Sequence, residues 1–431
     1  MRFFKFLVIS IFLIQGYLMS ATVKEIEVNG IKVPMIFERD SSLPIISMQV
    51  IFRNSGSIQD GQRYGLASFS AKMLNEGTKK LGSTKFAEVL DDNAIHLNIS
   101  NGNETFVCEI SSLKEKFPLA TKELSALLAD PNLSEQSFQK VKAMTLGDLS
   151  SKENDFDYIA SLNLKEMLFK GTPLAHSSIG NNSSIEALNL NDIKDFIKKH
   201  IVQKRAIIVI GGDIDIKDAK KYAKEVLSVL NEGEFKKVGF YEANANQETK
   251  VIKKDTKQAY IYFGSPFYMK VNDKNAYKAK VAAFILGSSG FGSRLMEGIR
   301  VKKGLAYSVY ARVNLNKSYS DFSGYLQTKV TTKEQAVKAV KEIIANFIKN
   351  GVTENELKSA KEFLSGSQPL RVETISQRLN RAFFEYYRGL KLGYFNEELK
   401  LIGKLKLSDL NHFIKEHPEI LKLTFSIVTK S

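Results

Sequence analysis

The sequence predicts an α+β protein made of two tandem homologous domains, each a largely antiparallel sheet with helices packed on one face. Three observations carry this prediction. The chain has 431 residues, enough for two domains of about 200 residues each. Two pairs of segments repeat at nearly the same offset, which indicates a tandem duplication. Strands are mixed with pairs of amphipathic helices without a steady βαβ order, which favours α+β domains.

The repeat relates the two halves of the chain. LSEQSFQKVK (133–142) aligns with VTENELKSAK (352–361) at an offset of 219 residues. LNDIKDFIKKH (190–200) aligns with LSDLNHFIKEH (407–417) at an offset of 217. Both members of the second pair end in histidine, and we expect these two histidines to have a structural role at a helix end.

Each half has the same expected order of elements: strands, a glycine-rich start of a helix, a further strand pair, amphipathic helices and a final β-branched strand. Ser134 and Thr353 are expected N-caps, and Glu356 completes a capping box with Thr353. The strands that begin and end each half are expected at 45–56, 205–215, 258–267 and 423–431.

The N-terminus, MRFFKFLVISIFLIQGYLMSA (1–21), places an apolar run behind Arg2 and Lys5. This pattern is typical of a secretory signal peptide. Met19 stands where cleavage prefers a small residue, so an uncleaved membrane anchor is the alternative. We expect a periplasmic protein that contacts a membrane only through this segment, if at all.

The mature chain is expected to divide into domains at 22–231 and 251–431. The stretch between them, 232–250, is polar and unpatterned and is the predicted linker. The single cysteine, Cys108, alternates with polar neighbours as a strand residue would, which favours a buried, inert thiol.

The formal net charge is +15. A basic balance can indicate nucleic-acid binding, but the lysines are spread over helix faces and no arginine cluster or recognition motif accompanies them. We expect no nucleic-acid partner, and a solvated basic surface that faces anionic envelope components or acidic peptides.

Four segments together resemble the insulinase-like (pitrilysin) peptidases, which include the mitochondrial processing peptidase and bacterial relatives. The likeness covers nearly the whole mature chain and implies a clam-like cavity that encloses extended peptides. The segments are GLASFSAKMLNEGT (65–78), LFKGTPLAHSSIGNNSSIEALNLNDIKDFI (168–197), IIVIGGDID (207–215) and LGSSGFGSRLMEGIRVKKGLAYSV (286–309).

Members of this family are inverted zincins with His-x-x-Glu-His on one helix. The resemblance places the first zinc ligand at Ser68, the catalytic base at Ala71, the second ligand at Lys72 and the third ligand at Asp148. A protonated lysine repels a divalent cation, and alanine cannot accept a proton. We expect this degenerate site to bind no metal and the chain to hydrolyse nothing alone, as a pseudoenzyme.

The helix of the degenerate site keeps a core-facing apolar stripe, so we expect it to be retained for packing. We predict that Lys72 pairs with Asp148, an ion pair in place of the metal. A second interpretation, in which Lys72 activates Ser68 as a nucleophile, is geometrically possible because the two share a helix face. A small polar residue on a packed helix is the favoured interpretation of Ser68.

The second half, unlike the first, matches the family at its expected substrate-binding positions. In the family, an Arg and a Tyr seven positions apart hold the substrate backbone, and the resemblance places them at Arg300 and Tyr307. A guanidinium offers fixed donors to a peptide carbonyl, and a phenol can donate to a developing oxyanion. A packed structural pair is the alternative.

In short bacterial relatives of this family, the zinc-binding residues and the substrate-binding Arg and Tyr often belong to two different chains. The resemblance therefore implies a heterodimer, in which a sister subunit with His-x-x-Glu-His supplies the zinc and this chain supplies Arg300 and Tyr307. Peptides are the expected substrates, and 93–106 is an expected edge strand that pairs with them. The alternative is a non-enzymatic scaffold or peptide-binding protein with the same fold.

Overall fold

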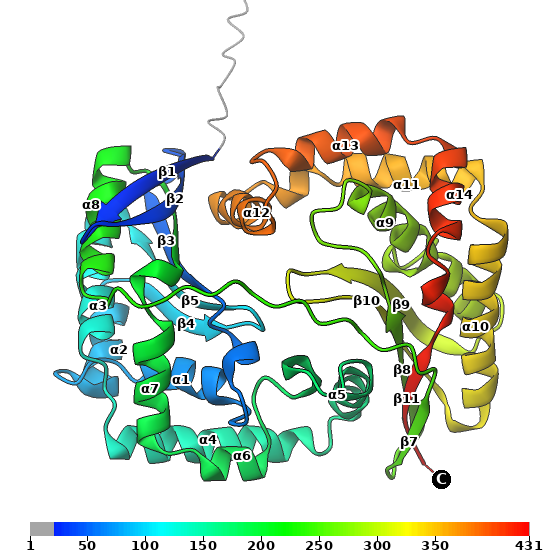
Figure 1. Ribbon diagram of the computed structural model, residues 1–431, viewed down its shortest axis with the longest axis horizontal. Helices are drawn as coiled ribbons and strands as arrows, with labels where there is room; N and C mark the ends of the chain where they lie inside the picture. Colours follow the sequence, from blue (N-terminus) through cyan, green and yellow to red (C-terminus); the bar gives the residue numbers. More distant parts are fainter. Residues whose placement is uncertain (1–20, 431) are drawn as a thin grey trace, which may run out of the picture.

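The computed structural model describes residues 21–430 and shows two halves, each with one sheet and its helices (Figure 1). The strands of the first half are β1 (Thr22–Val28), β2 (Ile31–Arg39), β3 (Ile45–Arg53), β4 (His96–Asn101), β5 (Thr105–Leu113) and β6 (Ala206–Gly212). Those of the second half are β7 (Thr249–Lys253), β8 (Gln258–Pro266), β9 (Ala306–Leu315), β10 (Ser320–Lys329) and β11 (Thr424–Thr429).

The helices follow the same division. Those of the first half are α1 (Leu66–Leu74), α2 (Gly82–Asp92), α3 (Phe117–Ala129), α4 (Glu135–Lys152), α5 (Phe156–Leu168), α6 (Asn182–Ala187), α7 (Leu190–His200) and α8 (Ile216–Ser228). Those of the second half are α9 (Ala276–Ala283), α10 (Lys333–Asn350), α11 (Glu354–Gly366), α12 (Ile375–Arg388), α13 (Tyr394–Lys404) and α14 (Leu407–Lys415). None of these helices is long and apolar enough to cross a bilayer.

The two sheets have related topologies. The first has the strand order β1-β2-β6-β3-β5-β4 and the second has β7-β11-β8-β10-β9. Each is antiparallel except for one pair, β2 with β6 and β7 with β11. The predicted α+β class with two homologous halves is confirmed.

The repeated helices begin with the expected caps. Ser134 precedes α4 and its side chain accepts a hydrogen bond from the Ser137 N–H. Thr353 precedes α11 and forms both bonds of a capping box with Glu356. These caps satisfy N–H groups that the first turn of a helix leaves without partners.

One helix of each half packs against the sheet of the other half; we call these two the exchanged helices. Helix α5 packs on β8 and β11, and α12 packs on β2 and β6, on the side of each sheet that faces the other half (Figure 1). The two helices begin at Phe156 and Ile375, an offset of 219 residues, so the exchange is part of the duplication. The prediction of helices on one face was therefore incomplete.

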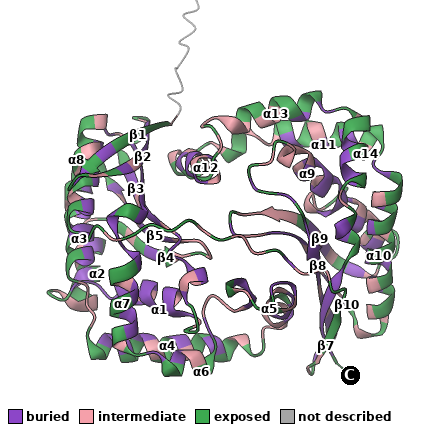
Figure 2. Cartoon of the chain, in the orientation of Figure 1, coloured by how far each residue is buried: buried purple, intermediate pink, exposed green. Residues whose placement is uncertain are grey.

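Strand alternation explains how α12 finds its place. On β3, Val50 and Phe52 point into the main core of the first half, whereas Ile51 points to the opposite face. There Ile51 belongs to a small apolar cluster with Leu379 and Phe383 of α12. Strands β3 and β6 are consequently buried along most of their length, and β3 is largely purple in Figure 2.

Polar contacts hold the exchanged helices as well. Arg378 of α12 forms ion pairs with Glu38 and Asp40, at the end of β2 and just beyond it. On α5, the Asn163 side-chain amide donates to Ser426 Oγ of β11 at 2.9 Å in a buried position. Removing one partner of such a buried contact leaves a polar group without compensation.

The predicted linker is an ordered connection. Residues 231–248 contain no helix or strand, and β7 begins at Thr249. The Tyr241 N–H donates to the Ser318 carbonyl at 2.7 Å, and the Asn244 N–H donates to the Leu168 carbonyl at 2.8 Å. Backbone bonds therefore hold this segment on both halves.

The equivalent histidines have the structural role expected of them. His200 ends α7 and stacks on Phe196, with ring centres 4.5 Å apart. His417 follows α14 and lies at the same 4.5 Å from Phe413. Cys108 is fully buried on β5, and burial raises the pKa of its thiol, as expected for an inert residue. The predicted signal peptide lies almost entirely outside the described residues.

His200 should make the first half sensitive to acid. Burial lowers the pKa of His200 from 6.5 to about 3, so the unfolded chain binds more protons than the folded chain between these values. Its contribution to stability is present above pH 6.5 and is lost as pH falls toward 3, by roughly 3 to 5 kcal/mol. We expect His200→Phe to flatten this part of the pH profile of urea unfolding.

The matched control for this prediction is His412→Phe, because His412 is an exposed histidine on α14 whose one ion-pair contact among residues 21–430 is with Glu416, just beyond the helix. It should leave the pH dependence of the parent unchanged. Equal pH dependence in the parent and His200→Phe would contradict the assignment.

Candidate functional site

The start of α1 is fixed by a buried carboxylate and a close backbone contact. Asp60 accepts hydrogen bonds from the N–H groups of Gly65 and Ala67 at 2.9 and 2.8 Å. Burial raises the pKa of Asp60 to about 7, against the effect of these two bonds. Gly65 has φ +92°, and a Cβ there would lie 2.7 Å from the carbonyl oxygen of Ile179. Only glycine suits this position.

The contact joins two of the segments that carry the family resemblance. Gly180, next to Ile179, has φ +78°, and a Cβ there would lie 2.4 Å from the Tyr64 carbonyl oxygen. The glycine of each segment thus makes room for the backbone of the other. These residues position α1 whether or not the helix carries catalytic groups.

Helix α1 presents one face to the core and the other to the degenerate site. The predicted stripe is confirmed, because Leu66, Phe69, Ser70, Met73 and Leu74 are all buried. At the degenerate site, Ser68 and Lys72 occupy the two ligand positions and are half-buried. Ala71 occupies the base position and is buried.

The predicted ion pair is present. Lys72 Nζ lies 2.7 Å from Asp148 Oδ2 and donates to Thr145 Oγ1 at 3.1 Å, both on α4. Position 72 on α1 and position 148 on α4 therefore face each other, as two zinc ligands would. The Lys72 side chain is 32% exposed and that of Asp148 is 61% exposed, so this pair contributes at most about 1 kcal/mol to stability.

The contacts of Lys72 do not favour the interpretation in which it activates Ser68. The Lys72 ammonium is bound by an acid and a hydroxyl, and no hydrogen bond joins it to Ser68 in the part of the chain that the structure describes. A lysine held in this way is a poor base for a serine nucleophile. Across residues 21–430, no group of three or more His, Cys, Asp or Glu side chains is placed to hold a metal ion.

The edge strand next to α1 is partly covered. The expected edge segment 93–106 contains β4, which is the last strand of its sheet. However, the Asn75 side chain donates to the Ile99 carbonyl at 2.8 Å and accepts from the Ile99 N–H at 3.0 Å. The outward backbone groups of Ile99 are thus occupied, and a peptide could not pair at Ile99 without displacing this amide. The sequence analysis did not anticipate this cap.

The structure brings Arg300 and Tyr307 together. Arg300 is the penultimate residue of a short π-helical segment, Met296–Val301, and Tyr307 is the second residue of β9. The Arg300 guanidinium lies 4.7 Å from the centre of the Tyr307 ring and 4.6 Å from that of Phe291. Tyr307 is 82% exposed and Phe291 is 69% exposed, whereas Arg300 is half-buried. We call these three side chains the Arg300 cluster.

Phe291 was not among the residues predicted from the sequence. It stands between Gly290 and Gly292, whose φ angles are +71° and +87°, in a loop that glycine allows to turn sharply. Contact with two rings limits the directions in which the guanidinium can point, and its N–H groups donate no hydrogen bond among the described residues. An aromatic residue between two glycines, shortly before the arginine that the resemblance singles out, is the pattern that could have revealed it.

Comparison with known proteins identifies the family. The sequence profile of insulinase, peptidase family M16, matches residues 36–182, and that of the peptidase M16 inactive domain matches residues 187–364. The "Non-peptidase homolog YmxG" of Helicobacter pylori is 43% identical over 403 residues, covering 94% of this chain and 93% of the relative. The chain belongs to peptidase family M16.

Other M16 proteins resemble the chain more distantly. An "Uncharacterized zinc protease YmxG" from Bacillus subtilis is 24% identical over 360 residues, covering 82% of this chain and 85% of the relative. A crystal structure titled as the peptidase M16 inactive domain from Pseudomonas fluorescens has a TM-score of 0.88 at 24% identity and covers 95% of this chain and 98% of its own. This likeness shows the fold.

Within this M16 fold, the two sets of candidate residues lie on different halves. The Lys72–Asp148 pair joins α1 and α4 of the first half, and the Arg300 cluster lies beside β9 of the second half. Among the described residues, no hydrogen bond, ion pair or ring stack connects the two sets. The two sets are therefore separate from each other within this chain.

Proposed function

We propose that this chain is the zinc-less, substrate-binding subunit of an extracytoplasmic heterodimeric M16 metallopeptidase. A sister chain with His-x-x-Glu-His supplies the zinc and the catalytic base. This chain supplies Arg300 to hold a peptide carbonyl and Tyr307 to donate a proton to the oxyanion that develops when zinc-bound water attacks the scissile bond.

The observation that carries this proposal is the contact of Arg300 with two exposed aromatic side chains. Tyr307 is 82% exposed and Phe291 is 69% exposed, and the half-buried Arg300 lies against both rings without a side-chain hydrogen bond or ion pair among the described residues. Phe, Tyr and Arg grouped together have the composition that is enriched at binding surfaces. The Lys72–Asp148 pair is the second support, since it joins α1 and α4 at the positions that the resemblance assigns to two zinc ligands.

The proposal is tested by expressing the chain with and without an M16 sister that carries His-x-x-Glu-His. A quenched fluorescent peptide is then assayed with each purified chain and with the mixture. We expect cleavage only in the mixture and co-elution of the two chains on size exclusion. Full activity of the sister alone, unchanged by this chain, would refute the proposal.

A non-enzymatic scaffold or peptide-binding protein is the second candidate. The name of the Helicobacter pylori relative, a non-peptidase homolog, favours it. In that case adding the sister produces no cleavage, and the two chains do not co-elute. The cleavage and size-exclusion assays therefore separate the two functions.

A further inference from the structure

A basic pocket lies where the linker meets both halves. Its volume is about 400 Å³, within the range of about 300 to 1,000 Å³ that is usual for ligand sites. Five cationic side chains line it, and no carboxylate does. They are Arg53 at the end of β3, Lys237 in the linker, Lys270 after β8, Lys317 in the β9–β10 turn and Arg388 at the end of α12.

These cations form no ion pair with an Asp or Glu within residues 21–430, and Arg53 instead donates to the carbonyls of Arg205 and Lys204 at 3.1 and 2.9 Å. The nearby Glu104 carboxylate, which acts on Lys317 and Arg388, accepts from the Ser318 N–H and hydroxyl at 2.7 and 2.6 Å. Burial lowers the pKa of Arg53 and Arg388. Their charged forms are therefore poorly solvated, and an anion in the pocket would offset part of that cost.

The pocket also has an aromatic wall. Phe235 lies 4.2 Å below the Arg53 guanidinium, and the Tyr387 ring lies 4.7 Å from Lys317 Nζ. The Tyr387 hydroxyl is buried and lies close to the Glu104 carboxylate. Aromatic rings beside clustered cations suit a peptide ligand that carries both carboxylates and apolar groups.

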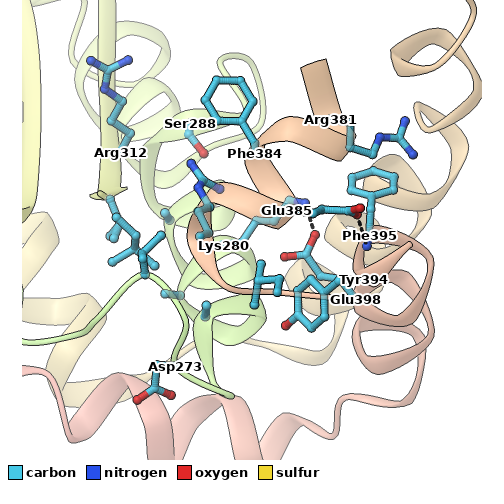
Figure 3. Close-up of a pocket in the computed structure, with 18 of the residues that line it drawn as sticks. Asp273, Lys280, Ser288, Arg312, Arg381, Phe384, Glu385, Tyr394, Phe395 and Glu398 are labelled. Atoms are coloured by element: carbon cyan, nitrogen blue, oxygen red, sulfur yellow. Dashed lines mark hydrogen bonds and ion pairs between the residues drawn. The ribbon is translucent and has the colours of Figure 1, made fainter. Parts of the chain in front are cut away.

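The neighbouring cavity shows that not every basic pocket here is an anion site. Arg388 also lines a cavity of about 460 Å³ between β9, α9, α12 and α13 (Figure 3). There the protein supplies its own carboxylates. Lys280 pairs with Glu398, and Glu385 accepts from the N–H groups of Gly393 and Phe395 at 2.7 and 2.8 Å. At the linker none of the lining residues is a carboxylate, and Glu104 and Glu398 act on the cations from outside the lining.

From this geometry we infer that the pocket formed by Arg53, Lys237, Lys270, Lys317 and Arg388 binds clustered carboxylates of an acidic peptide segment. The inference rests on the proposed function, because it assigns a preference to the peptides that this subunit binds. It adds a contact remote from Arg300 and Tyr307, which selects peptides by charge rather than by the scissile bond.

The test measures binding of a fluorescent peptide with three consecutive glutamates to the isolated chain at low salt. The variant replaces the three exposed lysines, Lys237→Gln, Lys270→Gln and Lys317→Gln. We expect its Kd to rise about tenfold or more, because three favourable charge contacts are lost. The parent should lose the same preference at high salt.

The control removes equal charge elsewhere, at Lys79→Gln, Lys80→Gln and Lys224→Gln, which are all exposed and outside the pocket. This control variant should change the Kd of the acidic peptide less than about twofold. For the pocket variant, replacing the glutamates of the peptide by glutamine should also change the Kd less than about twofold. An equal loss in the two triple variants would overturn the inference, because net charge alone would explain it.

Tripolyphosphate separates a phosphate site from a peptide site. If the pocket substitutions weaken binding of tripolyphosphate but leave binding of the acidic peptide unchanged, the inferred ligand is wrong. Cleavage of a peptide without acidic residues by the mixed subunits should be the same for the parent and the pocket variant. Failure of the pocket is thereby distinguished from failure of the proposed function.

Discussion

Replacing Arg300 with Ala and Tyr307 with Phe is expected to lower kcat/KM of the mixed subunits at least about 100-fold, because each lost donor to the peptide or its oxyanion costs about 10² to 10³ in rate. The single variants should differ. Arg300→Ala raises KM, since it removes a contact to the bound peptide backbone, whereas Tyr307→Phe lowers kcat, since it removes a donor used as the oxyanion forms.

The control pair is Lys302→Ala with Tyr268→Phe, which removes one exposed cation and one exposed phenol from the same half. It should leave kcat/KM within about twofold of the parent. Association of the two subunits, followed by size exclusion, must be unchanged in both pairs. Undiminished activity of the Arg300→Ala, Tyr307→Phe chain in an intact heterodimer would remove both residues from the site.

Restoring two histidines on α1 is expected to create a zinc site. Lys72 Nζ reaches Asp148 at 2.7 Å, and position 68 lies one turn before position 72, so Ser68→His with Lys72→His places two imidazoles beside a carboxylate. We expect one zinc per chain with a micromolar Kd or tighter, about 8 kcal/mol, measured by calorimetry and metal analysis. The variant should remain inactive, because Ala71 cannot act as a base.

The control for this prediction adds Asp148→Asn to the two histidine substitutions. It should weaken zinc binding by at least about tenfold, because a charged ligand is lost. If the double histidine variant keeps the helical circular dichroism of the parent and binds no zinc, α1 and α4 do not retain the geometry of a zinc site.

Much of the fold could be predicted because the duplication and the residue periodicity are local properties of the sequence. The capping residues Ser134 and Thr353, the buried stripe of α1 and the edge position of β4 all follow from short patterns. The Lys72–Asp148 pair could be predicted because the resemblance assigns zinc-ligand positions to both residues, and two ligands of one metal must face each other.

The exchanged helices could not be predicted in the same way. An amphipathic pattern shows that α12 buries one face, but it does not show which sheet that face meets. Ile51 and Leu379 are separated by more than 300 residues in the sequence and lie in one cluster. The Asn75 amide on Ile99 is likewise a contact that no spacing rule encodes.

The basic pocket was hidden for a related reason. Its five cations come from five separate segments, and along the sequence each is one more basic residue in a chain of net charge +15. A scattered distribution of lysine along the sequence predicts a solvated surface. Only the fold shows that these particular residues converge on a pocket that no carboxylate lines.

The proposed division of zinc site and substrate contacts between two subunits is tested most directly by titrating a fixed amount of the zinc-bearing sister with this chain and measuring the rate of cleavage of a quenched peptide. We expect no cleavage by either chain alone, and a cleavage rate that rises and reaches a plateau at one copy of this chain per sister. Cleavage by this chain alone, or a rate of the sister that does not depend on this chain, would contradict this division.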